Sequence, residues 1–283
     1  MTEVGEMPPP LQSDIWSDAL LAARLCAIDP LLGGLVLRGG GEARDAVIAA
    51  LVEGLDAGAP VRRVPSHIDD ERLLGGLDLG ATLSTGRAVS RVGLLAEADR
   101  GVVIVPMAER VASSTAAPIA AALDTGEVVA EREGMALRSP ARFTVVLLDD
   151  GVEPDERPPV ALAERVAFWF DLTGATLPSS VRPRTGSGVV EALPSLVDSG
   201  EEGQSFDKLR ANGLGGVRAP TNDALDAIAA TTLALGIDSA RAPSFALRAA
   251  RAAAILAGRS AITEGDVMIA ARPPGFSSHG RAR

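Results

Sequence analysis

The chain of 283 residues has one cysteine and two histidines, and each shortage excludes a class of protein. Cys26 alone cannot form an intramolecular disulfide framework, which indicates a reducing compartment, and we expect the cytoplasm. His67 and His279 lie far apart in the sequence, so no histidine-based metal site is expected. The net charge of −10 argues against general nucleic-acid binding, which depends on clustered Lys and Arg.

Long hydrophobic runs and lysine are also scarce. Although 47% of the residues are apolar, no run approaches the ~20 residues that a membrane span needs. The N-terminal segment, MTEVGEMPPPLQSD, lacks the basic start and apolar centre of a signal peptide. Positive charge comes almost entirely from Arg, with Lys208 as the single Lys, and Arg suits fixed ion pairs and interfaces. We therefore expect a globular protein with no membrane span.

Short apolar runs alternate with helical stretches over roughly residues 14–175. The runs are continuously apolar, which is typical of strands buried on both faces of a sheet. Alternation of strand and helix predicts a mainly parallel, doubly wound α/β domain. The expected strands are Leu35–Leu37, Val61–Val64, Val102–Val105, Phe143–Leu148 and Ala167–Leu172, and the expected helices are 14–27, 43–57, 92–99 and 114–124.

The composition changes after this α/β domain, which we place at residues 1–177. Residues 178–219 are rich in Pro, Ser and Gly and predict a flexible linker. Residues 220–272 are Ala-rich and predict a small helical domain, and residues 273–283 are expected to be a tail that leads to an absent C-terminal region. The expected helices of the second domain are Asn222–Leu235, Pro243–Ala257 and Thr263–Ala271.

A strand, a glycine loop and a helix follow one another in the segment GGLVLRGGGEARDAVIAAL. Gly39, Gly40 and Gly41 could bind an anion through backbone N–H groups at the helix N-terminus, or simply provide a tight turn. A working phosphate loop continues with Lys and then Ser or Thr, whereas this chain has Arg44 and Asp45. Asp45 brings a negative charge and no hydroxyl group for Mg²⁺. We interpret the loop as a vestigial nucleotide site.

A second part of an ATPase site is an acidic pair at the end of a buried strand. Here the strand GVVIV ends in Pro106–Met107, and neither side chain can bind Mg²⁺ or act as a base. Two independent catalytic parts are therefore missing from the sequence.

Three arginines outside the loop are candidates for phosphate contacts. Arg165 precedes the last expected strand and could be an arginine finger that reaches a neighbouring subunit's nucleotide, or a surface Arg paired with Glu164 or Asp155. In the helical domain, Arg248 and Arg241 could contact phosphate from the lid side or simply solvate a helix face.

Three segments resemble the AAA+ subunits of magnesium chelatase, and the resemblance covers about residues 14–272. The Gly-rich stretch 73–95 is too long for an ordinary connection, and it lies within a matching segment. Residues 125–143 predict a β-hairpin that turns near Glu133–Gly134. Within it, residues 130–143, AEREGMALRSPARF, resemble a hairpin of that family, and residues 246–267 resemble its helical lid. The matching positions in the first segment are Glu71–Arg72, Gly75 or Gly76, Leu77–Asp78, Gly93–Leu94–Leu95–Ala96 and Arg100–Gly101.

This resemblance implies a five-stranded parallel AAA+ sheet with flanking helices, followed by a small helical lid. The family has a smaller ATPase subunit and a larger D subunit, whose AAA+ module is commonly degenerate and is followed by an acidic linker and an integrin-like metal-binding domain. Arg165 matches the family's arginine-finger position. The departures from the ATPase subunit favour the D subunit, and they are Arg44, Asp45, Pro106, Met107 and Asp150, which replaces an Asn.

The resemblance further implies a non-hydrolysing platform in the complex that inserts Mg²⁺ into protoporphyrin IX during chlorophyll or bacteriochlorophyll biosynthesis. The expected partners are a ring of the ATPase subunit, which would own the ATP and Mg²⁺, and the porphyrin-binding large subunit. The chain itself is expected to bind no cofactor tightly and to be oligomeric in the complex. Two alternatives are an active ATPase in which Arg44 replaces the Lys, and a chaperone-like AAA+ regulator.

Overall fold

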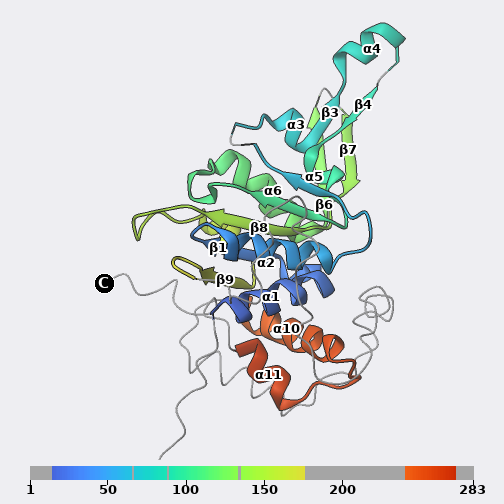
Figure 1. Cartoon of the computed structure of the whole chain (residues 1–283). Coiled ribbons are helices and arrows are strands. Elements are labelled where there is room, and N and C mark those ends of the chain that lie inside the picture. Colours follow the sequence, from blue (N-terminus) through green and yellow to red (C-terminus); the bar gives the residue numbers. More distant parts are fainter. Residues whose placement is uncertain (1–14, 66, 88, 133–134, 176–239, 272–283) are drawn as a thin grey trace, which may run out of the picture.

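A five-stranded parallel sheet forms the centre of the molecule in the computed structural model, which describes residues 15–65, 67–87, 89–132, 135–175 and 240–271 (Figure 1). The spatial order of the strands is β2-β5-β8-β1-β9, and each neighbouring pair is parallel. The strands are β1 (Gly34–Arg38), β2 (Val61–Arg63), β5 (Val102–Val105), β8 (Thr144–Asp149) and β9 (Phe168–Asp171).

The three central strands are buried along their whole length, as their continuous apolar sequences predict. The edge strand β2 is an exception, because two of its three residues are exposed. The expected parallel α/β fold is confirmed, and no strand end differs from the expected one by more than one residue. Val64 lies just beyond β2, although its N–H still donates to the carbonyl of Ile104 at 2.8 Å.

Successive residues of β1 point to two separate cores. Leu35 and Leu37 belong to the core beneath α1 (Ile15–Ile28) and α2 (Glu42–Glu53), while Val36 belongs to the core on the opposite face. That second core includes residues of α5 (Leu94–Glu97) and α6 (Ser113–Thr125).

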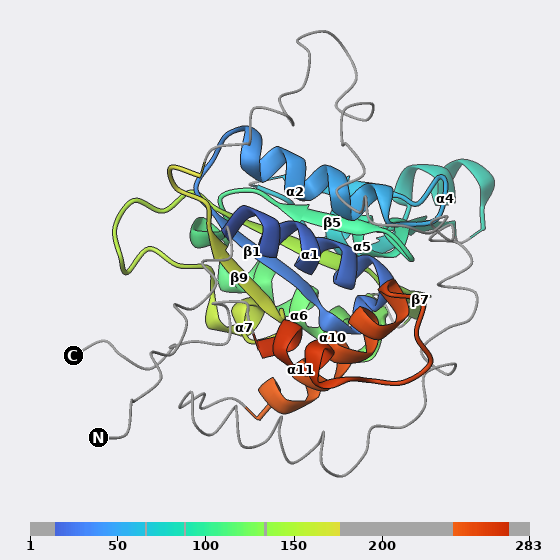
Figure 2. The same ribbon diagram turned by 60° about the horizontal axis from the view of Figure 1, so that its bottom comes forward.

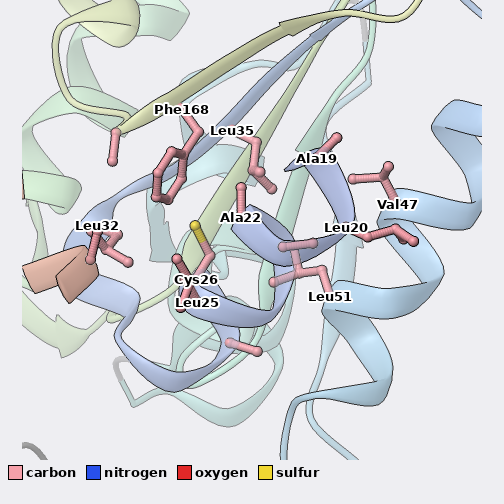
Figure 3. Packing of buried hydrophobic residues seen from close by; sticks show 14 of the residues in the cluster. Ala19, Leu20, Ala22, Leu25, Cys26, Leu32, Leu35, Val47, Leu51 and Phe168 are labelled. Carbon is pink, nitrogen blue, oxygen red and sulfur yellow. The ribbon is translucent and has the colours of Figure 1, made fainter. Parts of the chain in front are cut away.

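The core under α1 is built from closely packed apolar side chains (Figure 3). Leu25 and Cys26 of α1 face Phe168 of β9, and Leu20 meets Leu51 of α2. Burial and the nearby Asp29 raise the pKa of the Cys26 thiol, so Cys26 behaves as a small apolar side chain.

Two antiparallel hairpins extend from the sheet at the upper end of the view in Figure 1. The expected hairpin of residues 125–143 is confirmed by the pairing of Arg132 with Met135, and its turn lies outside the described residues. The Gly-rich stretch 73–95 forms a second hairpin with a short helix at its tip. The elements are α3 (Asp70–Leu74), β3 (Gly75–Leu77), α4 (Leu79–Thr85), β4 (Ser90–Val92), β6 (Glu127–Arg132) and β7 (Met135–Pro140).

The helical lid packs against α1, on the side away from the hairpins (Figures 1 and 2). It contains α10 (Ala242–Leu256) and α11 (Glu264–Ala271), and the buried face of α10 consists mainly of alanines that join the α1 core. The expected helix 222–235, the linker 178–219 and the tail 273–283 lie outside the described residues. None of the described helices combines the length and apolarity needed to cross a bilayer.

Candidate functional site

The glycine loop is a three-residue connection between the end of β1 at Arg38 and the start of α2 at Glu42. Gly39 has a φ of +82°, and a Cβ there would lie 2.8 Å from the backbone nitrogen of Thr173, so glycine is required. The N–H of Gly39 donates to the carbonyl of Asp149 at 3.1 Å. Gly41 is the N-cap of α2 and provides no side-chain hydrogen bond. The loop is therefore held by backbone contacts such as that of Gly39 with Asp149.

Arg44 spans the mouth of this loop. Its Nη1 lies 2.5 Å from Oδ1 of Asp150, the residue that follows β8. Its Nη2 would lie 3.7 Å from a Cβ placed on Gly40, so the guanidinium lies beside the glycines. The side chain of Arg44 is 17% exposed. The positive charge at this position is therefore matched by a carboxylate of the same chain.

Glu109 is a third member of this site. It lies in η2 (Ala108–Arg110), directly after the Pro106–Met107 turn that ends β5. Its side chain is 1% exposed, and Oε2 accepts a hydrogen bond from the N–H of Asp150 at 3.0 Å. Its Oε1 lies 3.4 Å from Nε of Arg110. The sequence analysis missed Glu109, although a Glu four residues beyond the end of a buried strand was the available signal.

Arg38 and Asp149 form a buried pair beneath the loop, and the sequence analysis missed both. Nη1 of Arg38 lies 3.2 Å from Oδ2 of Asp149, and the guanidinium also donates to three backbone carbonyls of the loop that follows β8. Burial raises the pKa of Asp149, assisted by the negative charge of Glu109 and opposed by Arg38 and the Gly151 N–H. The carbonyl acceptors are those of Gly151, Glu153 and Glu156.

Arg165 lies between α7 (Val160–Ala163) and β9. Its Nε and Nη2 donate to Oδ2 of Asp124 at 2.9 and 2.6 Å, and its Nη1 donates to the carbonyl of Ala161 at 2.7 Å. A Cβ on Gly33, whose φ is +76°, would lie 1.8 Å from the carbonyl oxygen of Arg165, so this glycine permits the close approach of the two backbones. Asp124 is therefore the carboxylate partner of Arg165.

The two lid arginines lie apart from the glycine loop. Nη2 of Arg241 is 3.0 Å from Oδ1 of Asp124, and Nη1 of Arg248 is 3.0 Å from Oδ2 of Asp29. Asp29 precedes η1 (Pro30–Leu32) and β1, whereas the glycine loop follows β1. The five residues of β1 separate these two places by about 16 Å at ~3.3 Å per residue. Of the arginines named above, the structure thus brings Arg44 to the glycine loop and leaves Arg248 at the other end of the strand.

Within the described part of the chain, no three His, Cys, Asp or Glu residues are grouped in a way that could hold a metal ion.

Comparison with known proteins finds an AAA lid domain and several magnesium chelatase subunits that are similar to this chain. Residues 225–273 match the model of the AAA lid domain. The chain is 36% identical to the 60 kDa subunit of magnesium chelatase from Cereibacter sphaeroides, over 90% of this chain and 39% of the relative. It is 30% identical to the 67 kDa subunit from Chlorobaculum tepidum, over 88% of this chain and 40% of the relative. It is 28% identical to the 38 kDa subunit from Rhodobacter capsulatus, over 87% of this chain and 80% of the relative.

The chain is a homologue of the AAA+ subunits of magnesium chelatase. A crystal structure from Cytophaga hutchinsonii has a TM-score of 0.62 at 15% identity and covers 92% of this chain and 84% of that chain. An MCM homologue from Methanopyrus kandleri has a TM-score of 0.59 at 15% identity, over 93% of this chain and 55% of that chain. The expected AAA+ fold is thereby confirmed. This chelatase homologue spans about 40% of the length of its larger relatives and matches both subunit types.

Proposed function

We propose that this chelatase homologue is a non-hydrolysing AAA+ platform, corresponding to the D subunit, in a complex that inserts Mg²⁺ into protoporphyrin IX. The ATP and its Mg²⁺ would belong to the ATPase subunit of the complex. The observation that carries the proposal is the ion pair between Arg44 and Asp150 across the glycine loop. A polyphosphate at this loop would have to displace that carboxylate and then face it at close range.

The first turn of α2 adds to this repulsion. Glu42 and Asp45 are both in that turn, where their negative charges interact with the positive end of the helix dipole. A phosphate would otherwise bind at this helix end. Asp45 also occupies the place of the hydroxyl residue that binds Mg²⁺ in a working loop. These residues do not fit a bound Mg-nucleotide, so no catalytic step is assigned to the loop.

The rival function, an active ATPase with unusual residues, needs a carboxylate for the metal or the attacking water. Pro106 and Met107 supply none at the end of β5. Three carboxylates around the ends of β5 and β8 are already engaged by the chain itself: Asp150 by Arg44, Asp149 by Arg38, and Glu109 by the Asp150 N–H and Arg110. An ATPase that recruited one of these three carboxylates would have to break the contact that holds it.

The platform would act through Arg165, offered to a nucleotide held by a neighbouring ATPase subunit. Its partners would be that subunit and the porphyrin-binding large subunit. The side chain of Arg165 is 20% exposed on the surface of the α/β domain, which is compatible with a contact between subunits. In this proposal the chain would transmit nucleotide-dependent changes and would not be the source of the energy.

Phosphate release by the purified full-length chain tests the absence of hydrolysis. We expect no Mg²⁺-dependent turnover above a blank, with the cognate ATPase subunit as the positive control. Turnover that tracks the purified chain and disappears in Arg44→Ala would overturn the proposal in favour of the active ATPase.

Mass photometry with the cognate ATPase subunit, with and without Mg-ATP, tests the platform itself. We expect a nucleotide-dependent mixed complex, and we expect Arg165→Ala to change the partner's ATPase rate. If the two proteins stay apart under every condition, the chaperone-like regulator becomes the better function for this chain.

A further inference from the structure

Asp124 joins three elements that are distant in sequence. It is the penultimate residue of α6, and its Oδ2 accepts from Arg165 while its Oδ1 lies 3.0 Å from Nη2 of Arg241. Arg165 precedes β9 and Arg241 is the residue before α10 of the lid. One carboxylate is therefore shared between the proposed finger and the lid.

The position of Asp124 in its helix is unfavourable for a carboxylate. The C-terminal end of a helix carries partial negative charge, so a basic residue there would stabilise α6 better. Although burial opposes ionisation, hydrogen bonds from Arg165 and Arg241 keep the pKa of Asp124 lowered. The two guanidinium groups, and not the helix, account for an aspartate at this place.

Arg165 is folded back against its own chain. Three of its N–H groups are engaged, two with Asp124 and one with the carbonyl of Ala161. An arginine finger must instead extend to a phosphate in another subunit. Extension therefore requires Arg165 to leave Asp124.

The surroundings of the contact between Asp124 and Arg165 favour an anionic ligand. A cavity of about 60 Å³ beside it is lined by Arg142, Arg165 and Arg241 together with apolar residues that include Leu31 and Phe245. The carboxylate of Asp124 contacts both Arg165 and Arg241. When Arg165 leaves, Arg241 remains as a counter-ion, so Asp124 does not become an isolated charge.

We propose that Asp124 is a positioning residue that holds Arg165 withdrawn, and that Arg241 of the lid eases its release to the phosphate of a neighbouring subunit's nucleotide. This inference rests on the proposed trans role of Arg165 and adds its regulation. Partly exposed ion pairs contribute little to stability, so a multiply charged phosphate can compete for the guanidinium. Lid displacement that moves Arg241 away from Asp124 tightens the hold on Arg165.

The test titrates the full-length chain into the cognate ATPase subunit and follows ATPase rate, so that the half-maximal concentration and the saturating effect are separated. Asp124→Asn keeps the side-chain shape and removes the charge, and we expect it to lower the half-maximal concentration roughly two- to five-fold. Arg241→Gln leaves Asp124 with Arg165 alone and is expected to raise that concentration by a similar factor. Both variants should keep the saturating effect of the wild type, whereas Arg165→Ala should lose it.

Shifts of the half-maximal concentration in opposite directions distinguish the positioning role of Asp124 from a merely structural one, because loss of packing would raise that concentration in both variants. Glu97→Gln, which breaks an exposed ion pair with Arg62 elsewhere on the domain, is the matched control and should titrate like the wild type. Thermal unfolding confirms that each variant is folded. Suppose that Asp124→Asn and Arg241→Gln shift the half-maximal concentration in the same direction or not at all, while Arg165→Ala loses the saturating effect. The positioning role of Asp124 is then refuted and the platform function stands. If Arg165→Ala behaves as the wild type, both fail.

Discussion

Arg38 and Asp149 are register partners at the ends of two neighbouring central strands, β1 and β8, and their side chains meet at 3.2 Å. The Asp149 side chain is fully buried, and Arg38 is only 10% exposed. Because Arg38 also donates to three carbonyls of the loop after β8, it fixes the segment that starts with Asp150. The pair thereby determines where Asp150 can meet Arg44.

Arg38→Met should destabilise the chain by about 3 kcal/mol at pH 7, because it leaves a buried carboxylate without its cation. The pKa of Asp149 is already raised by burial, so loss of Arg38 raises it further. The protonated form costs less to bury, so the loss should shrink as the pH falls. Denaturant unfolding at several pH values measures this, with Asp149→Asn added to Arg38→Met as the control that restores part of the stability. An equal loss at every pH would contradict the role given to Asp149.

Arg44→Lys combined with Asp45→Ser should improve nucleotide binding without creating an ATPase. The change restores the compact ammonium and the hydroxyl of a working loop. It leaves Pro106 and Met107 at the end of β5, where no metal ligand or base is available. We expect fluorescent ADP to bind at least about tenfold more tightly than to the wild type, which corresponds to 1.4 kcal/mol.

Arg44→Lys alone is the control for this prediction, because it keeps the repulsion from Asp45. Phosphate release should remain at the blank level in both variants. Turnover in the double variant would mean that another carboxylate, such as Glu109, can replace the missing acidic pair.

Arg248→Met should loosen the lid and leave any nucleotide binding unchanged. Arg248 is paired with the buried Asp29, at the opposite end of β1 from the glycine loop. Asp29 keeps a hydrogen bond from the N–H of Leu31, and Arg248 is 35% exposed, so we expect a loss of about 1–2 kcal/mol. Hydrogen exchange of α10 and α1 measures the loosening, and a double-mutant cycle with Asp29→Asn isolates the pair. Weaker binding of fluorescent ADP would instead favour the expected phosphate contact.

The sheet and the lid helices could be predicted because each carries its own local signal. The run Val102–Val105 is apolar at every position, and such a run forms a strand that is covered on both faces. The Ala-rich α10 has a helical pattern with a buried face. These signals depend on neighbours in sequence, so no knowledge of tertiary contacts was needed.

The partners of the charged residues could not be predicted in the same way. Arg165 and Asp124 are separated by 41 residues, and Arg38 and Asp149 by 111. Local spacing suggested Glu164 or Asp155 for Arg165, since both are close in sequence. Which carboxylate lies in reach depends on how α6 and α7 end relative to the sheet, and the sequence carries no local signal for that geometry.

Asp266→Asn should destabilise the lid in a pH-dependent way. Asp266 is fully buried and accepts from two nitrogens of Arg259, at 2.5 and 2.6 Å, and from both the N–H and the hydroxyl of Thr263, at 2.8 Å. Burial opposes ionisation, but the hydrogen bonds from Arg259 and Thr263 lower the pKa of Asp266 below its usual value. A lowered carboxyl pKa contributes stability above the unfolded-state pKa of about 3.9, and that contribution is lost as the pH falls through the folded-state value.

At pH 7 we therefore expect Asp266→Asn to lose about 2–3 kcal/mol, less than a fully buried pair would lose because Arg259 is 37% exposed. The gap between wild type and variant should close as the pH falls below about 4. Hydrogen exchange of α10 and α11 at both ends of this pH range is the measurement. Glu264→Gln, an exposed substitution on the same helix, should change little at either pH. A gap that stays constant from pH 7 to pH 3 would show that shape, and not the charge of Asp266, stabilises the start of α11.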